Sequence, residues 1–515
     1  MAGIAQRLKE AMEAKGLKQV DVIRLAEPIG REYNVRIGKS HMSQYLSGKS
    51  EPRKDILGVL AKTLEVDESW LAGEETEAAA PENRSGSSYT ASSEHKKEQT
   101  DVADSTRTVS DAGSSNIVYS EKMGDRVMRQ FSKSTKLDNV LYDVRGPVVE
   151  EANRMADAGM HILKLNIGNP APFGFRAPEE VVYDMRQQLT DCEGYSDSKG
   201  LFSARKAIMQ YAQLKNIQNV EIGDIYTGNG VSELINLSMQ ALLDDGDEIL
   251  IPSPDYPLWT ATATLAGGKV VHYLCDEQSE WNPDIDDIRK KVNSKTKAIV
   301  LEQIVQIARE NQLIIFSDEI YDRLVMDDGE HISIASLAPD VFCVTFSGLS
   351  KSHMIAGFRV GWMILSGNKD AAKDYIEGIN MLSNMRLCSN VPAQSIVQTA
   401  LGGYQSVKNY IVPGGRIYEQ REYMYKAVND IPGLSVVKPK AAFYSFPKID
   451  IKKFNIKNDE QFAYDFLKEK RVLIVHGGGF NWKEPDHFRI VYLPRVEVLE
   501  EAFGKLGDFL ETYHQ

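Results

Sequence analysis

The stretch that decides the fold is Phe346-Ser-Gly-Leu-Ser-Lys351-Ser-His-Met-Ile-Ala-Gly-Phe-Arg359-Val-Gly-Trp362. The apolar run from Val341 to Thr345 precedes it and predicts a buried strand. Lys351 follows this strand, where desolvation can neutralise an amine and make it a nucleophile. Arg359 keeps its proton and suits a bidentate grip on phosphate. An amine beside a phosphate clamp is what a pyridoxal phosphate (PLP) site requires, although a surface lysine in a turn is the simpler alternative.

The composition limits the class of protein. The chain has 515 residues, which predicts two or three domains. Its net charge is −13, so we do not expect the chain as a whole to have general affinity for nucleic acid. Its four cysteines lie far apart without metal-ligand spacing, so we expect reduced thiols and no metal site. The chain shows no apolar run of membrane-spanning length and no signal-peptide core at the N-terminus. These features predict a soluble, cytoplasmic protein.

Residues 1–73 predict a small all-α module. Apolar residues recur at helical spacing in four segments: 4–12, 17–26, 39–48 and 56–64. Gly16 and Gly48 follow the first and third of these helices. A turn with Pro28 and Gly30 is expected after the second helix, and Trp70 helps to close the core.

The module resembles the helix-turn-helix domain of the phage-repressor (XRE-like) class. The resemblance depends on Leu17-Lys-Gln-Val-Asp-Val22 and on Ser43-Gln-Tyr-Leu-Ser-Gly-Lys-Ser-Glu-Pro52, separated by an unusually long insertion, Glu27 to Ile37. It implies that the second helix of the pair enters the major groove of DNA. The implied DNA-binding residues are Gln19, Lys39, Ser40, His41, Ser43 and Gln44. Because basic and acidic residues nearly balance here, a docking or oligomerisation module is the alternative.

Residues 74–115 form a polar tract that contains almost no large apolar side chain. Such a composition cannot bury enough surface to offset the entropy of ordering. We therefore expect a disordered linker that joins two independent folded parts.

Residues 116–515 alternate apolar strand-like runs with amphipathic helices, which predicts an α/β fold with a mainly parallel sheet. The run from Leu313 to Phe316 leads to Asp318, at the end of a strand where open α/β sheets bind ligands. A carboxylate there can keep a pyridine nitrogen protonated. Asp224 to Gly228 predicts a strand that enters a glycine turn and then a helix, an arrangement that presents free N–H groups to an anion.

Ser350-Lys351 followed by Gly357-Phe-Arg-Val-Gly-Trp362 resembles the lysine signature of the fold-type I (class I/II) PLP-dependent aminotransferases. Other segments resemble the family in family order: 164–170, 194–205, 224–237, 248–259, 313–321 and 486–494. The resemblance covers roughly residues 116–515 and implies the aminotransferase fold, with a smaller α/β domain beside the main one. The amino-acid sequences of residues 164–175, 230–235 and 348–353 are similar to those of the alanine aminotransferase subgroup.

This resemblance implies a set of site residues. Lys351 would form the Schiff base with PLP and carry protons, Asp318 would pair with the pyridine nitrogen, and Tyr321 would hydrogen-bond the ring oxygen. The remaining implied cofactor contacts are Gly230, Val231, Arg359, Ser350 or Ser347 at the phosphate, Tyr256 on the ring, and Tyr195 from a neighbouring subunit. Taken singly, each residue also has an ordinary structural explanation, such as a core aromatic or a capping aspartate.

Two further residues are predicted to contact the substrate, and Tyr195 bears on whether the protein is a dimer. Arg489 lies in an apolar run, where a buried guanidinium needs an anion, and the family places the substrate carboxylate there. Gly168 matches a position where backbone approaches the substrate. If Tyr195 reaches a neighbouring site, the protein is a homodimer.

The sequence departs from the family near residues 300–301. Lys297 to Val300 predicts a strand and Leu301 to Asn311 predicts a helix, with no connection between them. The family's Asn-Pro-rich loop, whose asparagine contacts cofactor and substrate, is missing there. The helix could unwind to supply a loop, the site could hold PLP less well, or the chain could be inactive.

The function implied by the resemblance is transfer of an amino group from L-alanine to 2-oxoglutarate, which gives pyruvate and L-glutamate. Two alternatives stay open from sequence alone. One is a transcription regulator that responds to PLP or to an amino acid, and the other is an inactive homologue that lacks the Asn-Pro-Thr-Gly loop.

Overall fold

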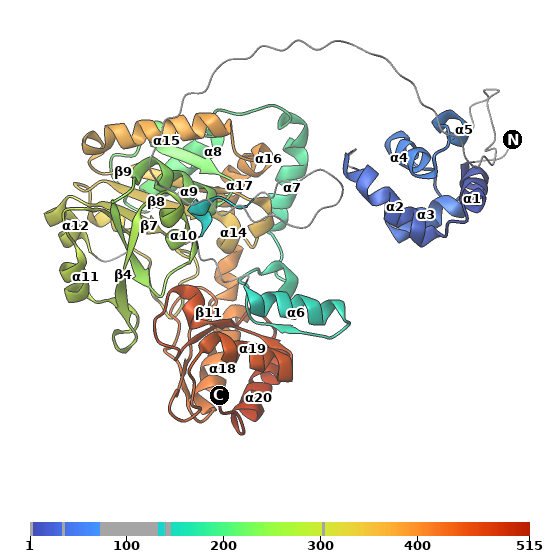
Figure 1. The fold of residues 1–515 in the computed structure, drawn as a ribbon. Helices are drawn as coiled ribbons and strands as arrows, with labels where there is room; N and C mark the ends of the chain where they lie inside the picture. Colours follow the sequence, from blue (N-terminus) through green and yellow to red (C-terminus); the bar gives the residue numbers. More distant parts are fainter. Residues whose placement is uncertain are drawn as a thin grey trace, which may run out of the picture. The chain divides into compact units, whose positions relative to one another are not determined.

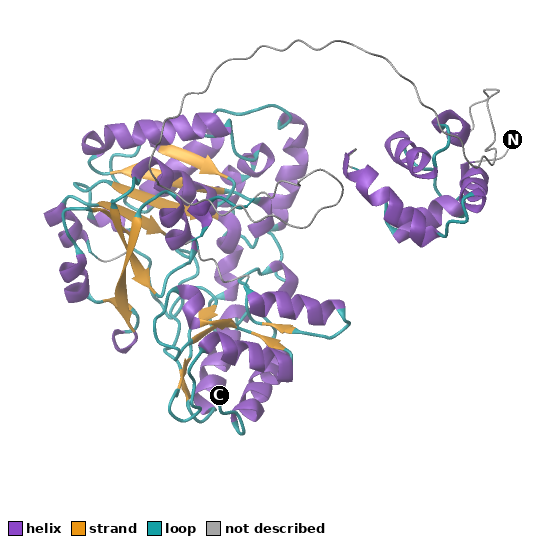
Figure 2. Ribbon diagram, in the orientation of Figure 1, coloured by secondary structure: helices purple, strands orange, loops and turns teal. Residues whose placement is uncertain are grey.

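The computed structural model describes residues 4–32, 35, 37–72, 132–138, 140, 146–300 and 304–515 (Figures 1 and 2). The chain divides into two compact units, Met1–Asn116 and Ile117–Gln515. The predicted linker, residues 74–115, lies outside the described residues. Among the helices that the structure describes, none is long and apolar enough to cross a membrane.

The residues that the structure describes in the first unit form helices, as predicted. Its helices are α1 (Ile4–Ala14), α2 (Gln19–Glu32), α3 (Lys39–Leu46), α4 (Lys54–Leu64) and α5 (Glu68–Ala72). Leu8, Val22, Met42, Leu60 and Leu71 are fully buried at its centre, so the helical spacing of the apolar residues correctly indicated the core.

The predicted turn at Pro28 and Gly30 is wrong, because α2 continues through both residues to Glu32. A proline inside a helix removes one backbone hydrogen bond and usually ends the helix. Here Ile29 packs against the core of the unit, and Val35 N–H donates to the Gly30 carbonyl (2.8 Å). Tertiary packing therefore outweighs the local preference for a turn.

An eight-stranded, mainly parallel sheet dominates the second unit, as predicted. In spatial order its strands are β2 (Ile225–Gly228), β9 (Gly361–Ser366), β8 (Cys343–Gly348), β7 (Ile314–Asp318), β6 (Thr296–Val300), β3 (Glu248–Ser253), β4 (Lys269–Asp276) and β5 (Asn282–Pro283). Strands β8, β7, β6, β3 and β4 are parallel, and β2, β9 and β5 pair antiparallel. The buried strands are almost continuously apolar, which is typical of a sheet covered on both faces.

Helices cover both faces of this sheet. Alternate strand residues such as Ile249 and Phe316 face a core that includes α9 (Val231–Leu242), α10 (Leu258–Leu265) and α15 (Lys373–Arg386). Their neighbours Leu250 and Ile315 face the opposite core. That core includes residues of α8 (Phe202–Leu214), α11 (Ile285–Lys291), α12 (Val305–Asn311), α13 (Ile334–Leu337), α16 (Val391–Ser395) and α17 (Val397–Gly402). The helices α7 (Glu179–Gln188) and α14 (Leu349–Ser352) also contribute to this core, through Val181 and Leu349.

A smaller α/β part packs around a third core. Its strands are β1 (Leu163–Lys164), β13 (Val472–Leu473), β10 (Leu434–Ser435), β12 (Lys448–Ile449), β11 (Tyr444–Ser445), β15 (Phe488–Val491) and β14 (Val475–His476). Its helices are α6 (Pro147–Asp157), α18 (Arg416–Asp430), α19 (Asp459–Lys470) and α20 (Val496–Leu510). Aromatic side chains from α19, β15 and α20, among them Phe462, Phe488 and Phe509, fill the centre.

The connection after β6 differs from the prediction. The strand is present, but the helix begins at Val305 and not at Leu301, because Ile304 has non-helical backbone angles (φ −122°, ψ 47°). Residues 301–303 lie outside the described residues. Ile304, Ile307 and Ala308 are buried against the sheet, and this packing sets where the helix can start. The predicted strand at 341–345 likewise starts later, at Cys343, and continues to Gly348.

Candidate active site

Four neighbouring strands bring chemically useful residues to one edge of the sheet. Asp318, the last residue of β7, pairs with Phe346 of β8. Gly348 at the end of β8 pairs with Gly361, which in turn pairs with Gly228 at the end of β2. Lys351 follows within α14, directly after β8. The sheet therefore gathers at one edge the segments that the sequence analysis had singled out.

Gly230 and Arg359 form a cradle at the start of α9. Gly230 caps that helix with φ 87°, which favours glycine. A Cβ at this position would lie 2.4 Å from Arg359 Nη2, so a larger residue would displace the guanidinium. Arg359 Nη2 donates to the Asn229 carbonyl (2.9 Å) and Nη1 to the Ala356 carbonyl (3.0 Å). An exposed guanidinium fixed beside a helix N-terminus, where Val231 begins α9, is a suitable anion site.

Lys351 points toward the segment that follows β1. Its Nζ donates to the Gly168 carbonyl at 2.8 Å and lies 5.7 Å from the centre of the Phe443 ring. The lysine is half-buried. Gly168 is needed here, because a Cβ would lie 1.9 Å from the Tyr444 hydroxyl oxygen.

Arg489 of β15 lies between two aromatic rings. Its guanidinium carbon is 4.7 Å from the centre of the Tyr444 ring and 4.4 Å from that of Phe480, and Nη2 donates to the Asn166 carbonyl. Asn166 is two residues before Gly168. The segment 166–168 thus contacts both Lys351 and Arg489, and it joins the amine to the guanidinium.

Tyr321 lies near Asp318 and also contacts the aromatic residues beside Lys351 and Arg489. Its ring lies edge-on to Phe443 and Tyr444, with centroid distances of 5.6 and 5.8 Å. Burial raises the pKa of the Tyr321 phenol well above its usual range, and a hydrogen bond with Tyr444 adds to the rise. Arg489 lowers this pKa and Asp318 raises it, so both charges are close to the phenol.

The two serines that the sequence offered for phosphate differ in accessibility. Ser347 is buried in β8, and its hydroxyl donates to the Glu319 carbonyl (3.4 Å). Ser350 is half-buried in α14, next to Lys351. This difference favours Ser350.

Tyr256 and Tyr195 are both exposed aromatics. Tyr256 precedes α10 and is 45% exposed, and its loop is tied to the Phe480 turn because Asp255 N–H donates to the Phe480 carbonyl (3.0 Å). Tyr195 is 84% exposed, which is unusual for a large aromatic side chain.

Sequence reasoning missed three residues of the site: Asn166, Phe443 and Tyr444. Asn166 acts through its backbone carbonyl, which no side-chain pattern can indicate. Phe443 and Tyr444 belong to the run Ala441-Ala-Phe-Tyr-Ser-Phe446. A tyrosine within a short aromatic run was the available signal, since a half-buried phenol needs a polar partner.

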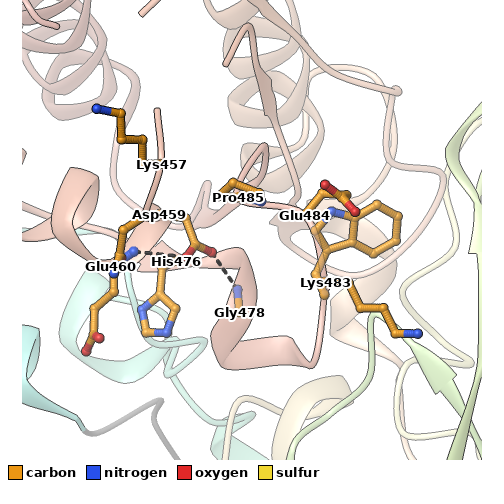
Figure 3. A pocket seen from close by; sticks show the side chains of 10 residues that line it. Lys457, Asp459, Glu460, His476, Gly478, Lys483, Glu484 and Pro485 are labelled. Atoms are coloured by element: carbon orange, nitrogen blue, oxygen red, sulfur yellow. Dashed lines mark hydrogen bonds between the residues drawn. The ribbon is translucent and has the colours of Figure 1, made fainter. Parts of the chain in front are cut away.

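The turn 476–480 has a different environment on each of its two sides. Phe480, at the end of the η10 turn (Gly477–Phe480), packs on Arg489. A separate cavity of about 350 Å³ beside the turn is lined by charged residues of 457–460 and 483–484 and by His476 (Figure 3). There Gly478 N–H donates to Asp459 Oδ2 (2.7 Å), a bond that fixes the turn to α19.

The predicted DNA-contact residues lie on the two helices of the pair. Gln19 begins α2, and Lys39 and Ser40 begin α3. His41, Ser43 and Gln44 are exposed on α3, whereas Met42 and Tyr45 are buried. The exposed face of α3 is therefore polar.

Comparisons with known proteins show the family of the chain. Residues 160–506 match the family described as aminotransferase class I and II. The chain is 59% identical over 404 residues to glutamate-pyruvate aminotransferase AlaA of Haemophilus influenzae, an alignment covering 75% of this chain and all of that protein. A crystal structure of an Escherichia coli aminotransferase is 56% identical with a TM-score of 0.74, covering 75% of this chain and 100% of the other. The Pyrococcus furiosus alanine aminotransferase is 38% identical with a TM-score of 0.71, covering 74% and 100%.

The chain belongs to the class I and II aminotransferases. It is an enzyme of the aminotransferase class, and its cofactor is PLP. The comparisons favour this enzyme over the regulator and the inactive homologue considered from sequence. The donor set fits PLP, since it offers an amine (Lys351), an anion cradle in which Gly230 leaves room for the Arg359 guanidinium, and a carboxylate at the end of β7.

Proposed function

We propose that this protein transfers an amino group from L-alanine to 2-oxoglutarate, giving pyruvate and L-glutamate, at the site around Lys351. The observation that carries the proposal is the joint contact of Lys351 and Arg489 with the segment 166–168. An amine that can act on an α-carbon thus lies near a cation that can hold an α-carboxylate. Relatives at 57–59% identity are named glutamate-pyruvate aminotransferases, which supports this substrate pair.

We assign the cofactor contacts as follows. Arg359, Gly230, Val231 and Ser350 hold the phosphate, Tyr256 covers the ring, and Lys351 is the covalent attachment point. Asp318 faces the pyridine nitrogen, and Tyr321 donates to the ring oxygen. When bound, PLP supplies an electron sink for the carbanion formed at the substrate α-carbon.

The chain's own residues then perform the remaining tasks. Arg489 binds the substrate carboxylate and orients the Cα–H bond toward Lys351. The Lys351 amine takes the proton from that carbon, which requires the neutral amine. Phe443, Phe480 and Tyr444 place apolar surface beside Lys351 and Arg489, and this strengthens the contact between Arg489 and the substrate carboxylate.

The direct test is turnover of the purified full-length chain. Alanine with 2-oxoglutarate is expected to give pyruvate, measured by coupled NADH oxidation with lactate dehydrogenase. Arg489→Leu should raise KM for alanine and leave PLP binding intact. Failure of the wild-type protein, loaded with PLP, to release pyruvate from alanine would contradict the proposal.

We propose that the active form is a homodimer in which Tyr195 completes the neighbour's site. Tyr195, Met385 and Leu387 are 84%, 78% and 54% exposed on adjoining segments, which are joined by a hydrogen bond between Ser198 Oγ and Asn384 Oδ1 (2.7 Å). Large apolar side chains exposed on adjoining segments favour an interaction surface. A second copy of the chain would cover it.

Mixing two inactive variants tests this arrangement. A hybrid dimer of Lys351→Ala and Tyr195→Ala chains contains one site with both changes and one site with neither. Co-refolding should therefore restore activity that neither variant has alone. If Tyr195 serves its own chain, both sites of the hybrid stay defective and activity is not restored.

We propose, as a second function, that the N-terminal domain (residues 1–73), joined by a linker over residues 74–115, binds DNA as a helix-turn-helix module. The polar, exposed face of α3 is the observation that favours it. Binding of the full-length chain to DNA selected from a random library should weaken with salt and with Gln44→Ala. An exposed substitution outside the pair, Glu13→Ala, is the control. Equal binding to any DNA by all three proteins would contradict sequence recognition by α3.

A further inference from the structure

Tyr444 contacts both the carboxylate-binding arginine and the cofactor-facing tyrosine of the site. It lies on β11 opposite Val491 of β15. Arg489 is two residues from Val491 on the same strand, so it lies on the same face of the sheet as Tyr444. The guanidinium accordingly lies over the Tyr444 ring at 4.7 Å.

The other end of Tyr444 reaches a different group. The position of a Cβ on Gly168 lies 1.9 Å from the Tyr444 hydroxyl oxygen, so this hydroxyl rests against the backbone that accepts from Lys351. The Tyr321 ring stands edge-on to Tyr444 at 5.8 Å. Tyr444 also raises the pKa of the Tyr321 phenol, which agrees with the closeness of the two side chains. One side chain therefore presents its ring to Arg489 and its hydroxyl to Tyr321.

We propose that Tyr444 is a positioning residue with two separable roles, its ring face holding Arg489 for the substrate carboxylate and its hydroxyl holding Tyr321 for the cofactor ring oxygen. This inference rests on the proposed roles of Arg489 and Tyr321. Tyr321 cannot donate its single hydrogen to both Tyr444 and the cofactor. In the loaded enzyme Tyr444 is therefore the donor to Tyr321, and this makes Tyr321 a stronger donor.

The two roles predict different effects for two substitutions. Tyr444→Phe keeps the ring under Arg489 and removes the hydroxyl. Tyr444→Leu removes the ring as well. A cation–π contact in a partly desolvated site adds roughly 1 kcal/mol, so loss of the ring should weaken carboxylate binding by about threefold to tenfold.

The hydroxyl has its own spectroscopic readout. The Tyr321 contact to the cofactor ring oxygen competes with the proton on the Lys351 nitrogen for the same oxygen. A weaker Tyr321 donor lets that nitrogen keep its proton to higher pH. Loss of one hydrogen bond should move the midpoint of the pH-dependent absorbance change upward by about half a unit to one unit. The charges that face Tyr321, Arg489 and Asp318, are unchanged in both variants.

The experiment measures two quantities on the PLP-loaded full-length chain: the midpoint of its visible absorbance change with pH, and the dissociation constant of propionate, an unreactive carboxylate. Tyr444→Phe should shift the midpoint upward. It should leave propionate affinity within about twofold of the wild-type value, because the ring stays in place. Tyr444→Leu should shift the midpoint and also weaken propionate. Tyr423→Phe, which removes a hydroxyl in the contact with Phe503 of the smaller part, should change neither quantity.

Two results would overturn the inference. An unshifted midpoint in Tyr444→Phe refutes the role of the hydroxyl, and unchanged propionate affinity in Tyr444→Leu refutes the role of the ring. Failure of the proposed function has a different signature, because the wild-type protein itself would then bind no propionate or show no pH-dependent absorbance.

Discussion

Replacing Gly230 with alanine should selectively damage the phosphate site. The new methyl group would lie 2.4 Å from Arg359 Nη2, and it would force the guanidinium away from the start of α9. The backbone at φ 87° adds strain of about 1–2 kcal/mol for a residue other than glycine. Loss of a hydrogen bond to a charged group costs about 1.5–3 kcal/mol, so PLP should bind about 10- to 150-fold more weakly.

A matched glycine separates the clash from the strain. Gly246 has φ 95° and no heavy atom within 4 Å of the position that a Cβ would take, so Gly246→Ala carries the strain alone. Dissociation constants for PLP and for pyridoxal, which lacks the phosphate, are measured from the visible absorbance of each protein. Gly230→Ala should weaken PLP far more than pyridoxal, and Gly246→Ala should change neither. Tight PLP binding by a folded Gly230→Ala protein would refute the assignment of the cradle.

Three further predictions concern other parts of the enzyme domain. Arg489→Lys should lower kcat/KM for alanine by at least about tenfold, because it replaces a bidentate donor with a point charge. The dissociation constant of PLP should stay the same. An equal loss of PLP affinity would show that Arg489 does not act on the substrate carboxylate alone. Burial lowers the pKa of His353 to about 4, below the unfolded value of about 6.5, so its neutral form stabilises the fold and this contribution falls as pH drops from 6.5 toward 4. The thermal midpoint of His353→Asn should therefore depend less on pH between about 7 and 5 than that of the wild type, and parallel curves would exclude His353 as a cause. Insertion of an Asn-Pro-Thr-Gly loop between Val300 and Leu301 should raise turnover and increase the affinity for PLP by about tenfold or more, because a hydrogen bond to a charged group contributes about 1.5–3 kcal/mol. A Gly-Ser insertion of equal length should change neither quantity.

The sequence predicted the elements of the site better than their contacts. Apolar runs that ended in Asp318 and Lys351 correctly placed both residues at one edge of a parallel sheet, because the carboxyl ends of parallel strands meet there. The glycine turn before α9 was also predictable, since only glycine tolerates φ 87° beside a guanidinium. Local signals of this kind are strong because they depend on the backbone alone.

The contacts that sequence could not predict depend on tertiary packing. Asn166 takes part through a carbonyl, and Tyr444 joins Arg489 only because β11 pairs with β15 in one register. The same cause explains the error at Pro28, where burial of the neighbouring Ile29 keeps α2 intact. The helix start at Val305 was likewise set by packing of Ile304 and Ile307 on the sheet.

The proposed catalysis at this site requires that Lys351 be the amine that holds PLP, near Arg489, because both residues contact the segment 166–168. Borohydride reduction of the PLP-loaded chain, followed by peptide mass spectrometry, tests this most directly. We expect the phosphopyridoxyl mass on the peptide that contains Lys351, and none on that peptide in Lys351→Ala. Labelling of a different lysine in the wild-type protein, with Lys351 unmodified, would contradict the assignment of this amine and of the site built around it.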